Sequence, residues 1–538
     1  MNLSLIGFGP RERPQWIIVD IGVTFGDLTT PGVELILPDI TFIEERRKDL
    51  LGIVLTHAHE DHIGALPALW PRLKCPVYAT RFTAALVRDK LSQAGLERAV
   101  PMTIVELGAR FGIGPFDIEY VTLTHSIPEP NALAIRTPLG TLFHTGDWKI
   151  DSDPLIGQRT DEKRLLEIGR EGVLAMLCDS TNVFTEGESG SESSVRESLV
   201  ELIASLKGKV AVTTFASNVA RLTSVIAAAE SAGRHVALIG RSMHRITGAA
   251  RESGYLSDTA KLISEEEAGY LPDDAVLYLC TGSQGEPRAA LSRIAAGTHP
   301  HVSLGQGDTV IFSSRIIPGN ETEIFGLQNQ LAARGVRVLT EKDHFVHVSG
   351  HPCRGELARM YQWIRPEIAV PVHGELRHLQ EHAALARELQ VPQARVAPNG
   401  AMLRLAPGPA EIVDHVHAGR LYLDGEVLAD SGDPAFAARR RLAGAGAIIV
   451  ALAFDRRGRL SADPEIRLLG APEGLAEPDA DLIERLSDAI ERSVNRLSPD
   501  DRLDDDSVDL AVRKAVRAHL KRHWSKRPHI EVILLEAG

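Results

Sequence analysis

The sequence predicts a multidomain α/β protein with three parts: a sheet-on-sheet core flanked by helices, a second α/β domain inserted into that core, and a small C-terminal α/β domain. Three observations predict it. The first 180 residues hold apolar, β-branched runs with few helices between residues 100 and 150, the pattern alternates between helix and strand from about residue 192, and histidine-rich segments return from His344 onward. With 538 residues, the chain is also too long for one ordinary hydrophobic core.

In the first part, apolar runs predict strands, and several of these strands end in polar clusters. Strands are expected at residues 15–25, 53–55, 76–78, 103–107, 116–124, 132–137, 140–144 and 173–178, and helices at residues 63–73 and 82–95. Four of the strands end at the stretch 57–62, His125, Asp147 and Asp179. Open α/β sheets place their sites at such strand ends.

From about residue 192 the pattern is that of a parallel α/β domain. Strands are expected at residues 209–214, 235–239, 275–279, 309–313 and 336–339, and helices at 193–206, 218–232 and 321–334. A later strand, 368–372, ends at His373 and returns the chain to the first domain. The expected boundaries are 1–191 and 354–425 for the two parts of the first domain, 192–353 for the insertion, 426–445 for a linker and 446–538 for the C-terminal domain.

The C-terminal domain is predicted to contain two amphipathic helices between two strands. The strands are expected at 446–454 and 529–535, and the helices at 481–497 and 507–524. Apolar residues recur on one side of each helix, which predicts self-association or docking. We therefore expect a homodimer or homotetramer formed through this domain, or a further protein partner docked on it.

Composition bounds the setting of the protein. Hydrophobic residues make up 44% and charged residues 24%, which is ordinary for a soluble globular chain. No run of eighteen apolar residues and no secretory signal is found, so no membrane partner is expected. The four cysteines are scattered, which favours a reducing cytoplasm. The net charge of −13 does not favour nucleic acid but leaves it possible, because phosphate binding needs only a local basic surface.

The stretch 55–62, L-T-H-A-H-E-D-H, carries the strongest chemical signal. Three imidazoles and a carboxylate within six residues cannot all lie in a core. On a strand they would alternate between faces, whereas in a tight loop they can converge on one point. Imidazole and carboxylate ligands favour zinc, and also manganese or iron, over calcium.

Distant residues complete a two-metal site. The candidate ligands of one metal are His57, His59 and His125, and those of the other are Asp61, His62 and His373. The candidate bridge between the two metals is the carboxylate of Asp147. Such a pair lowers the pKa of a shared water and clamps the attacking and leaving oxygens of a phosphodiester, which is hydrolysis without a protein nucleophile. The predicted cofactor is two divalent ions, with Zn²⁺ favoured and Mn²⁺ or Mg²⁺ left open.

These motifs resemble a known family. The H-A-H-E-D-H loop, T-H-S-I-P and H-T-G-D resemble the metallo-β-lactamase fold, and the insertion followed by H-V-S-G-H and P-V-H-G-E is similar to the β-CASP nucleases, above all bacterial ribonuclease J. The strings D-S-T-N, T-F-A-S-N, T-G-S-Q-G-E-P and R-I-I-P-G-N-E also match it, over roughly residues 15–420. The resemblance implies an αββα metallo-β-lactamase sandwich with an inserted β-CASP domain.

The resemblance also implies a function and the residues that perform it. It implies a two-metal RNA hydrolase with 5′-to-3′ exonuclease and endonuclease activity in RNA maturation and decay, including rRNA processing and mRNA decay. Asp179, His351 and His373 take the family's three β-CASP positions, so the catalytic candidates are Asp61, Asp179 and His351. A histidine near the scissile phosphate can steady developing charge or protonate the leaving oxygen.

A second set of residues matches the family's pocket for a 5′-terminal monophosphate. Its members are hydroxyl, amide and imidazole side chains: Ser217, Asn218, His347 and Ser349, with His351 close by. Such groups suit a terminal phosphate, whose extra charge distinguishes it from an internal one. Arg315 is a candidate for binding the RNA backbone, or forms a structural salt bridge.

Three alternatives remain open. A β-CASP DNA nuclease would share most of the motifs, but those relatives typically lack a histidine at the position of His373. A small-ester hydrolase of the glyoxalase type would share the first loop but would not need the insertion. A weakly active RNA-binding or scaffold subunit would not need the complete ligand set.

The beginning of the chain departs from the family pattern. Family members usually begin with a Gly-rich strand segment of the type G-G-x-G-E-I-G-x-N, whereas this chain begins at Met1-Asn2-Leu3. From this we expect an exposed sheet edge and the loss of part of the loop beneath the metals.

Overall fold

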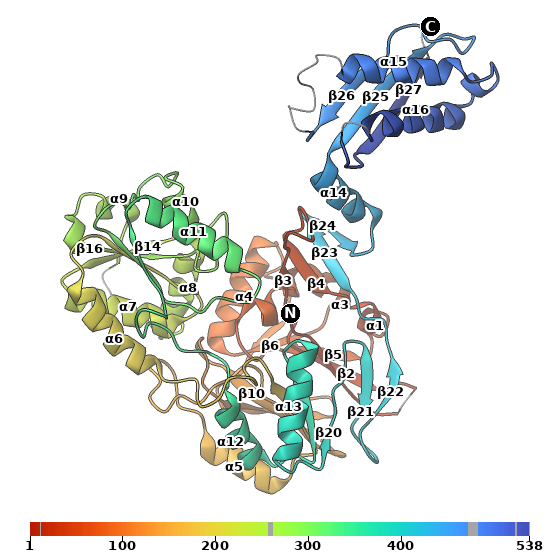
Figure 1. Ribbon diagram of the computed structural model, residues 1–538. Coiled ribbons are helices and arrows are strands. Elements are labelled where there is room, and N and C mark those ends of the chain that lie inside the picture. Colours follow the sequence, from red (N-terminus) through yellow and green to blue (C-terminus); the bar gives the residue numbers. More distant parts are fainter. Residues whose placement is uncertain (11, 257–261, 472–481, 522–523, 537–538) are drawn as a thin grey trace. The chain divides into compact units, whose positions relative to one another are not determined.

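The computed structural model describes residues 1–10, 12–256, 262–471, 482–521 and 524–536 (Figure 1). The chain forms two compact units, one made of residues 1–24 and 37–418 and the other of residues 25–36 and 419–538. In the part of the chain that is described, no helix is long and apolar enough to cross a membrane.

Two stacked sheets form the core of the first unit. Their strand orders are β1-β2-β5-β6-β7 and β20-β19-β12-β11-β10-β9-β8. The strands are β1 (Ser4–Phe8), β2 (Gln15–Val19), β5 (Leu50–Val54), β6 (Val77–Ala79), β7 (Met102–Ile104), β8 (Arg110–Ile113), β9 (Phe116–Thr122), β10 (Asn131–Thr137), β11 (Gly140–His144), β12 (Ala175–Asp179), β19 (Ile368–Val372) and β20 (Gln393–Ala394). Ile17, Val54, Ile118 and Leu133 are buried in one cluster between the sheets, so the predicted sheet-on-sheet core is confirmed.

Helices cover the outer face of the seven-stranded sheet (Figure 1). Leu165, Leu357 and Leu385, one from each of three helices, are buried against it. These helices are α5 (Glu162–Glu171), α12 (Arg354–Ile364) and α13 (Leu376–Glu388). The remaining elements of this half are α1 (Thr41–Glu44), α2 (Glu60–Ile63), α3 (Leu66–Leu73), α4 (Arg81–Gln93) and the strand pair β21 (Ala401–Arg404) and β22 (Glu411–His415).

The stretch between β12 and α12 contains a six-stranded sheet of order β15-β14-β16-β13-β17-β18, whose pairs are all parallel. Its strands read as continuous apolar runs because helices lie on both faces. They are β13 (Val210–Thr213), β14 (His235–Ile239), β15 (Leu262–Ile263), β16 (Val276–Cys280), β17 (Thr309–Phe312) and β18 (Arg337–Leu339). The helices are α6 (Glu192–Ser205), α7 (Val219–Ser231), α8 (Arg241–Glu252), α9 (Glu265–Ala268), η1 (Asp273–Ala275), α10 (Ala290–Ala295) and α11 (Glu321–Ala333).

The two segments that connect this parallel sheet to the stacked sheets are bonded to each other. Arg354 N–H donates to the Thr185 carbonyl at 2.8 Å, and Gly355 N–H donates to the Gly187 carbonyl at 3.0 Å. The fully buried Glu356 carboxylate accepts from Ser189 N–H at 2.9 Å and from Cys353 N–H at 2.8 Å. It also accepts from the N–H of Ile150 at 2.7 Å and from the Ser189 hydroxyl at 2.8 Å. One carboxylate therefore joins both connections to the loop that follows β11.

The second unit contains two smaller sheets. One has the order β24-β23-β4-β3 and the other the order β26-β25-β27. The elements are β3 (Thr24–Phe25), β4 (Leu35–Pro38), β23 (Arg420–Asp424), β24 (Val427–Asp430), α14 (Pro434–Ala445), β25 (Ala447–Phe454), β26 (Glu465–Leu469), α15 (Leu482–Asn495), η3 (Asp501–Leu503), α16 (Asp505–Leu520) and β27 (His529–Glu536).

The stretch 426–445, predicted to be a linker, forms regular secondary structure. It contains β24 and α14, and Asp433 caps the helix by accepting from Ala435 N–H at 2.8 Å. Proline at the first helical position and an Ala/Arg-rich run favour the helix, although this composition resembled a linker.

The predicted apolar stripes of the C-terminal helices are not free for a partner. The buried residues lie in one cluster with the strands β25, β26 and β27. They are Leu482, Leu486, Ile490 and Val494 of α15, and Val508, Val512, Val516 and Leu520 of α16. The periodicity was recognised, but the stripes form this domain's own core. Residues 481 and 522–523 of the predicted helices lie outside the described residues.

The first residues of the chain contact the histidine-rich stretch 55–62. β1 pairs antiparallel with β2 and forms the edge of the five-stranded sheet. Asn2 N–H donates to the Asp61 carbonyl at 2.8 Å, and its amide nitrogen donates to Asp61 Oδ2 at 3.0 Å. We expected an exposed sheet edge here, and β1 is that edge. We also expected the loop beneath the metals to lack part of its contacts, and the hydrogen bonds from Asn2 supply contacts to that loop.

We predict that Glu356→Leu lowers the free energy of unfolding by about 3 kcal/mol or more, because three buried backbone N–H groups lose their acceptor. Urea denaturation followed by tryptophan fluorescence measures the change. Glu388→Leu is the matched control, since Glu388 is 64% exposed and its carboxylate pairs with Arg354 at the surface, so its loss costs less than about 1 kcal/mol. Equal effects of the two substitutions would contradict the role assigned to Glu356.

Candidate metal centre

The histidine loop begins where β5 ends. Residues 55–59 have no regular secondary structure, and His59 directly precedes the short helix α2. His57 and His62 are buried, whereas the side chain of Asp61 is 35% exposed. The loop thus presents its side chains to one side of the strand end, as predicted for a tight loop.

Three ring nitrogens of the first predicted ligand set converge on one point. His59 Nδ1 lies 3.1 Å from His57 Nε2 and 3.1 Å from His125 Nε2. Asp147 Oδ2 lies 3.8 Å from His57 Nε2 and 4.0 Å from His125 Nε2. One potential ligand atom from each of these four residues lies within 4.8 Å of all the others.

The second predicted set is grouped around the same carboxylate. Asp147 Oδ2 lies 3.1 Å from His62 Nε2, and Asp147 Oδ1 lies 2.6 Å from His373 Nδ1. Asp61 Oδ2 lies 3.4 Å from His62 Nε2 and 3.5 Å from His373 Nε2. Asp147 is therefore common to both sets, which is the position expected of a bridge.

The remaining ring nitrogens show that the centre suits a cation. The Thr56 hydroxyl donates to Asp20 Oδ2 at 2.8 Å, so its oxygen accepts from His57 Nδ1 at 2.9 Å. His125 Nδ1 donates to the Gly350 carbonyl. Both Nε2 atoms are then lone-pair acceptors, and both lie 3.1 Å from His59 Nδ1, which carries at most one proton for the two. A metal ion is the partner that such acceptors require.

The protonation states agree with this fit. Burial lowers the pKa of His57 and of His125 well below the usual value, and lowers the pKa of His59 to about 4. Burial alone would raise the pKa of Asp147, but the adjacent His373 holds it well below its usual value. Neutral imidazoles and ionised carboxylates are the forms that bind metal ions, so the first donor set fits a divalent cation. Burial alone would lower the pKa of His62 and of His373, but Asp147 outweighs it and raises both, so a cation at the second set would displace protons from these rings.

His351 stands beside this cluster and is paired with Asp179. Its Nδ1 lies 2.8 Å from Asp179 Oδ2 and 3.9 Å from Asp147 Oδ2. Burial disfavours the charged form, but Asp179 outweighs it and raises the pKa of His351 to about 9. The imidazole is therefore protonated at neutral pH and can donate a proton to an anion from Nε2.

Asp20 is a site residue that the sequence analysis recorded only as part of a strand. It is buried, has a φ of 61° and accepts from Thr56 N–H at 2.8 Å through Oδ1. Its Oδ2 lies 2.7 Å from His62 Nδ1. Asp20 thus orients His62 directly and His57 through Thr56. The sequence feature that could have indicated this role is a carboxylate at the end of an apolar run, in the predicted strand that precedes the histidine loop's own strand.

Glu60, within the histidine loop, is bound by cations from two helices. Lys90 Nζ of α4 lies 2.6 Å from Glu60 Oε1, and Arg245 Nη2 of α8 lies 3.5 Å from the same oxygen. The metal-binding loop is therefore tied to a helix that packs on the parallel sheet.

The predicted phosphate-binding residues lie near the centre, but the side chain of one of them, Asn218, is used to build the fold, as described below. Ser217 Oγ lies 3.1 Å from His59 Nε2, and Ser349 Oγ accepts from Asn182 Nδ2 at 2.7 Å. Arg315 is exposed, and its Nη1 donates to Asn182 Oδ1 at 3.4 Å. Asn182, which the sequence analysis did not select, therefore connects Ser349 to Arg315.

His347 has a free ring nitrogen, whereas Asn218 does not have a free side chain. Within the described residues, His347 Nδ1 is buried without a hydrogen-bond partner. Burial, followed by the charge of Arg221, lowers the pKa of His347 to about 3. Asn218 accepts from Arg221 N–H at 2.9 Å as the cap of α7 and donates to Glu192 at 3.1 Å. Its side chain is therefore used to build the fold.

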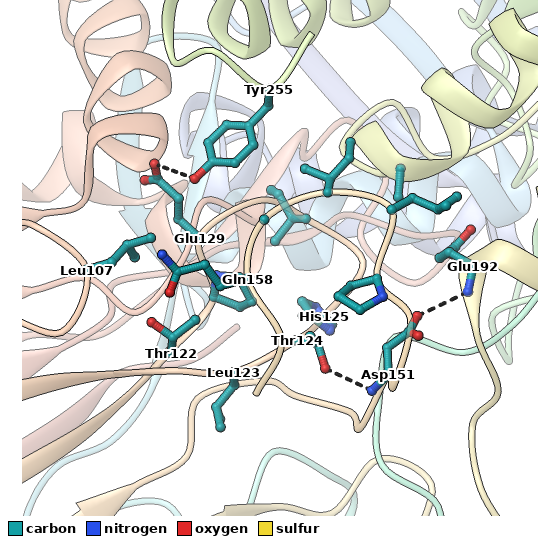
Figure 2. A pocket seen from close by; sticks show the side chains of 17 residues that line it. Leu107, Thr122, Leu123, Thr124, His125, Glu129, Asp151, Gln158, Glu192 and Tyr255 are labelled. Carbon is teal, nitrogen blue, oxygen red and sulfur yellow. Dashed lines mark hydrogen bonds between the residues drawn. The ribbon is translucent and has the colours of Figure 1, made fainter. Parts of the chain in front are cut away.

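A cavity of about 30 Å³ lies behind His125 (Figure 2). Tyr255 donates to Glu129 at 3.0 Å on one side of it, and Glu192 N–H donates to Asp151 at 3.1 Å on the other. This volume holds about one water molecule and is far too small for a nucleotide. The cavity therefore belongs to the packing behind the centre.

A buried polar chain supports the other side of the centre. Ser180 Oγ lies 2.8 Å from His382 Nδ1, and His382 Nε2 lies 3.0 Å from the Tyr361 hydroxyl. Ser180 N–H also donates to the His373 carbonyl at 3.3 Å. The chain ties the loop that carries Asp179 to α13 and to the segment that carries His373.

Four family models match successive parts of the chain. They are a beta-lactamase superfamily domain (residues 15–214), a ribonuclease J beta-CASP domain (207–331), a Zn-dependent metallo-hydrolase RNA specificity domain (335–394) and a ribonuclease J C-terminal domain (435–537). Ribonuclease J of Sinorhizobium meliloti is 47% identical over 99% of this chain and 94% of its own length. Those of Mycolicibacterium smegmatis and Thermus thermophilus are 39% and 36% identical over 97% and 98% of this chain and 93% and 92% of their own lengths.

The chain belongs to the ribonuclease J family. The predicted fold, a metallo-β-lactamase domain with a β-CASP insertion and a C-terminal domain, is confirmed. As a member of the ribonuclease J family, the chain is a hydrolytic ribonuclease that binds RNA and divalent metal.

We predict that the polar chain behind the centre is sensitive to acid. Burial lowers the pKa of His382 from 6.5 to about 4, so the unfolded state binds its proton more tightly. The stability that neutral His382 contributes is complete above pH 6.5 and decreases by about 3 kcal/mol towards pH 4. Denaturation of the wild type and of His382→Phe across this range should show a steeper loss in the wild type. Parallel pH profiles would contradict the prediction.

Proposed function

We propose that this ribonuclease binds two divalent ions, with zinc favoured, and cleaves RNA both from a 5′-monophosphate end and internally. The two ligand sets that share Asp147 support the number of ions. Bound ions would supply a water of lowered pKa and positive charge for the phosphodiester oxygens. The proposed ligands are those given by the sequence: His57, His59 and His125; Asp61, His62 and His373; and the bridging Asp147.

In this proposal, His351 and Asp179 act on the scissile phosphate. The 2.8 Å contact with Asp179 holds the His351 ring in one orientation and stabilises its charged form. A protonated imidazole can neutralise charge that develops on the phosphate and can give its Nε2 proton to the leaving oxygen. Asp61 is 35% exposed, so among the proposed ligands it is well placed to face the substrate and the attacking water.

A 5′-terminal monophosphate is proposed to bind Ser217, His347 and Ser349, with Arg315 near the backbone. The free Nδ1 of His347 and the two hydroxyl groups support this, because each can donate to or accept from a phosphate. We no longer count the side chain of Asn218 among the direct contacts, although Asn218 fixes the turn in which Ser217 lies.

The alternatives are less well supported. The approach of His373 Nδ1 to Asp147 favours an RNA nuclease over a β-CASP DNA nuclease, whose third motif typically lacks this histidine. The complete ligand sets disfavour a scaffold subunit. Four unpaired, buried cysteines support a cytoplasmic setting, and the proposed roles there are rRNA processing and mRNA decay, with RNA-decay proteins as partners.

We also propose a homodimer or homotetramer formed through the C-terminal domain, on a different surface from the one first predicted. The helices cover one face of the β26-β25-β27 sheet. Ile533 of β27 is 42% exposed and Leu535 is 55% exposed. They alternate along the strand with Val532 and Leu534, which pack on the core. An uncovered apolar sheet face supports self-association.

His59→Ala is expected to reduce RNA cleavage by more than about 100-fold, the upper end of what loss of an outer-shell partner of a metal site costs. Bound metal, measured by mass spectrometry, should decrease, while the circular-dichroism spectrum is retained. His301→Ala is the control, because His301 is 40% exposed and pairs with Glu266 at the surface. Full activity of His59→Ala would exclude the proposed centre.

Cleavage of 5′-monophosphate RNA is expected to be at least about tenfold faster than cleavage of the same RNA with a 5′-triphosphate, because one or two hydrogen bonds to a charged group supply this discrimination. The reactions should be run with Zn²⁺, Mn²⁺ and Mg²⁺, and with matched DNA. Ser349→Ala should lower the ratio of the two rates towards one.

A circular RNA of the same sequence has no end and therefore isolates endonuclease action. We expect the wild type and Ser349→Ala to cleave it at similar rates. Equal rates on the two 5′ ends would remove the proposed pocket, and an uncut circle would remove endonuclease action from the proposal.

A further inference from the structure

The loop after β12 exposes an aromatic ring beside the metal centre. Phe184 is 53% exposed, although Val183 next to it is fully buried. Single exposed apolar residues are common and need no explanation by themselves. Phe184 differs from them in the groups that surround it and in the two segments that it joins.

The ring of Phe184 lies between two side chains of α13. The His378 ring meets it edge-on, with ring centroids 5.2 Å apart, and the guanidinium carbon of Arg377 lies 5.6 Å from its centroid. Arg377 is exposed, and within the described residues no ion pair engages it. A ring and an unneutralised guanidinium therefore lie next to each other at the surface.

Both segments that form this surface also carry residues of the centre. Phe184 follows Asp179 by five residues, and Arg377 follows His373 by four. Ser180 N–H donates to the His373 carbonyl at 3.3 Å. The position that a Cβ on Gly374 would take lies 2.9 Å from His378 Cβ and 3.4 Å from Ser180 Cβ. The start of the loop and the first turn of α13 are thus closely packed around Gly374.

The loop that carries Phe184 also reaches the groups suited to a terminal phosphate. Asn182, two residues before Phe184, donates to Ser349 Oγ at 2.7 Å and to the His351 carbonyl at 3.0 Å. Gly350, between Ser349 and His351, accepts from His125. The same loop therefore borders the phosphate-binding residues and the segment that carries His373, so an RNA strand bound at both would lie close to Phe184.

We propose that Phe184 and Arg377 form a stacking site for one nucleobase of the RNA strand that is being cleaved. This inference rests on the proposed cleavage of RNA. Aromatic rings and guanidinium planes bind the faces of bases, which every base offers, so the site would hold the strand without reading its sequence. A base, rather than a phosphate, is the indicated ligand because the ring is uncharged and Arg377 lies over its face.

The test uses the full chain and 5′-monophosphate RNAs of one sequence, each with a single abasic nucleotide at a different position, beginning with the 5′-terminal nucleotide and continuing past the cleaved linkage. For the wild type, we expect one of these substitutions to raise KM by about fivefold to 100-fold, the range for loss of one base–aromatic stack. Phe184→Ala should raise KM on intact RNA by the same factor and show no further loss with the abasic RNA. Phe184→Trp should restore the wild-type values.

The matched control is Phe325→Ala, since Phe325 of α11 is similarly exposed, at 47%. This variant should behave as the wild type. Independent, multiplicative losses from Phe184→Ala and the abasic nucleotide would overturn the proposal, as would an unchanged KM of Phe184→Ala. Sedimentation that shows Phe184→Ala to be dissociated relative to the wild type would assign the ring to an interface between copies and would equally overturn it. If the proposed function itself fails, the wild type will leave intact RNA uncut. This result differs from every outcome above, because each of those requires a wild type that cleaves RNA.

Discussion

One buried carboxylate, Asp147, is the constraint on which the rest of the structure depends. It is 3% exposed and approaches ring nitrogens of both ligand sets, from 2.6 Å at His373 to 4.0 Å at His125. A buried charge is costly unless it is paired and hydrogen-bonded. The histidines around it must therefore be held in fixed orientations by groups farther out. The positions of Asp20, Thr56 and the Gly350 carbonyl follow from this requirement, because each engages the outer nitrogen of a ring and leaves the inner nitrogen facing the centre.

The same requirement explains why the two segments that connect the α/β domains are held together by several hydrogen bonds. Gly350, which fixes His125, lies in the second connection, and Ser217, which contacts His59, lies in the inserted domain. A rotation of that domain would move both partners away from their rings. Glu356 joins both connections, and a buried ion pair between Glu192 and Arg221 joins the first two long helices of the insertion. Rigidity here is therefore a property of the metal centre as much as of the fold.

The sequence predicted those parts of the site that depend on local spacing. Residues 57–62 form a loop after a strand whatever surrounds them, and the apolar runs that end at His125, Asp147, Asp179 and His373 specify strands. It could not predict what depends on packing. Asp20 resembled any strand carboxylate, because its partner Thr56 is 36 residues away. Asn218 looked available for a ligand, yet it caps α7. The stripes of α15 and α16 were visible, but periodicity does not tell whether a stripe faces its own sheet or a partner.

A protein that degrades RNA of any sequence must bind its substrate through features that all RNAs share, namely phosphate charge, strand polarity and the faces of bases. The net charge of −13 gives no overall attraction for RNA, so binding depends on local groups. In the proposed binding mode these groups lie close to the metals: Ser217, His347 and Arg315 would contact phosphate, and Phe184 would contact a base. Contacts of this kind act only when the strand is already in position. Under the proposals made above, selectivity for a 5′ end and indifference to sequence would both follow from this arrangement, since the donors would recognise the terminus and the ring would accept any base.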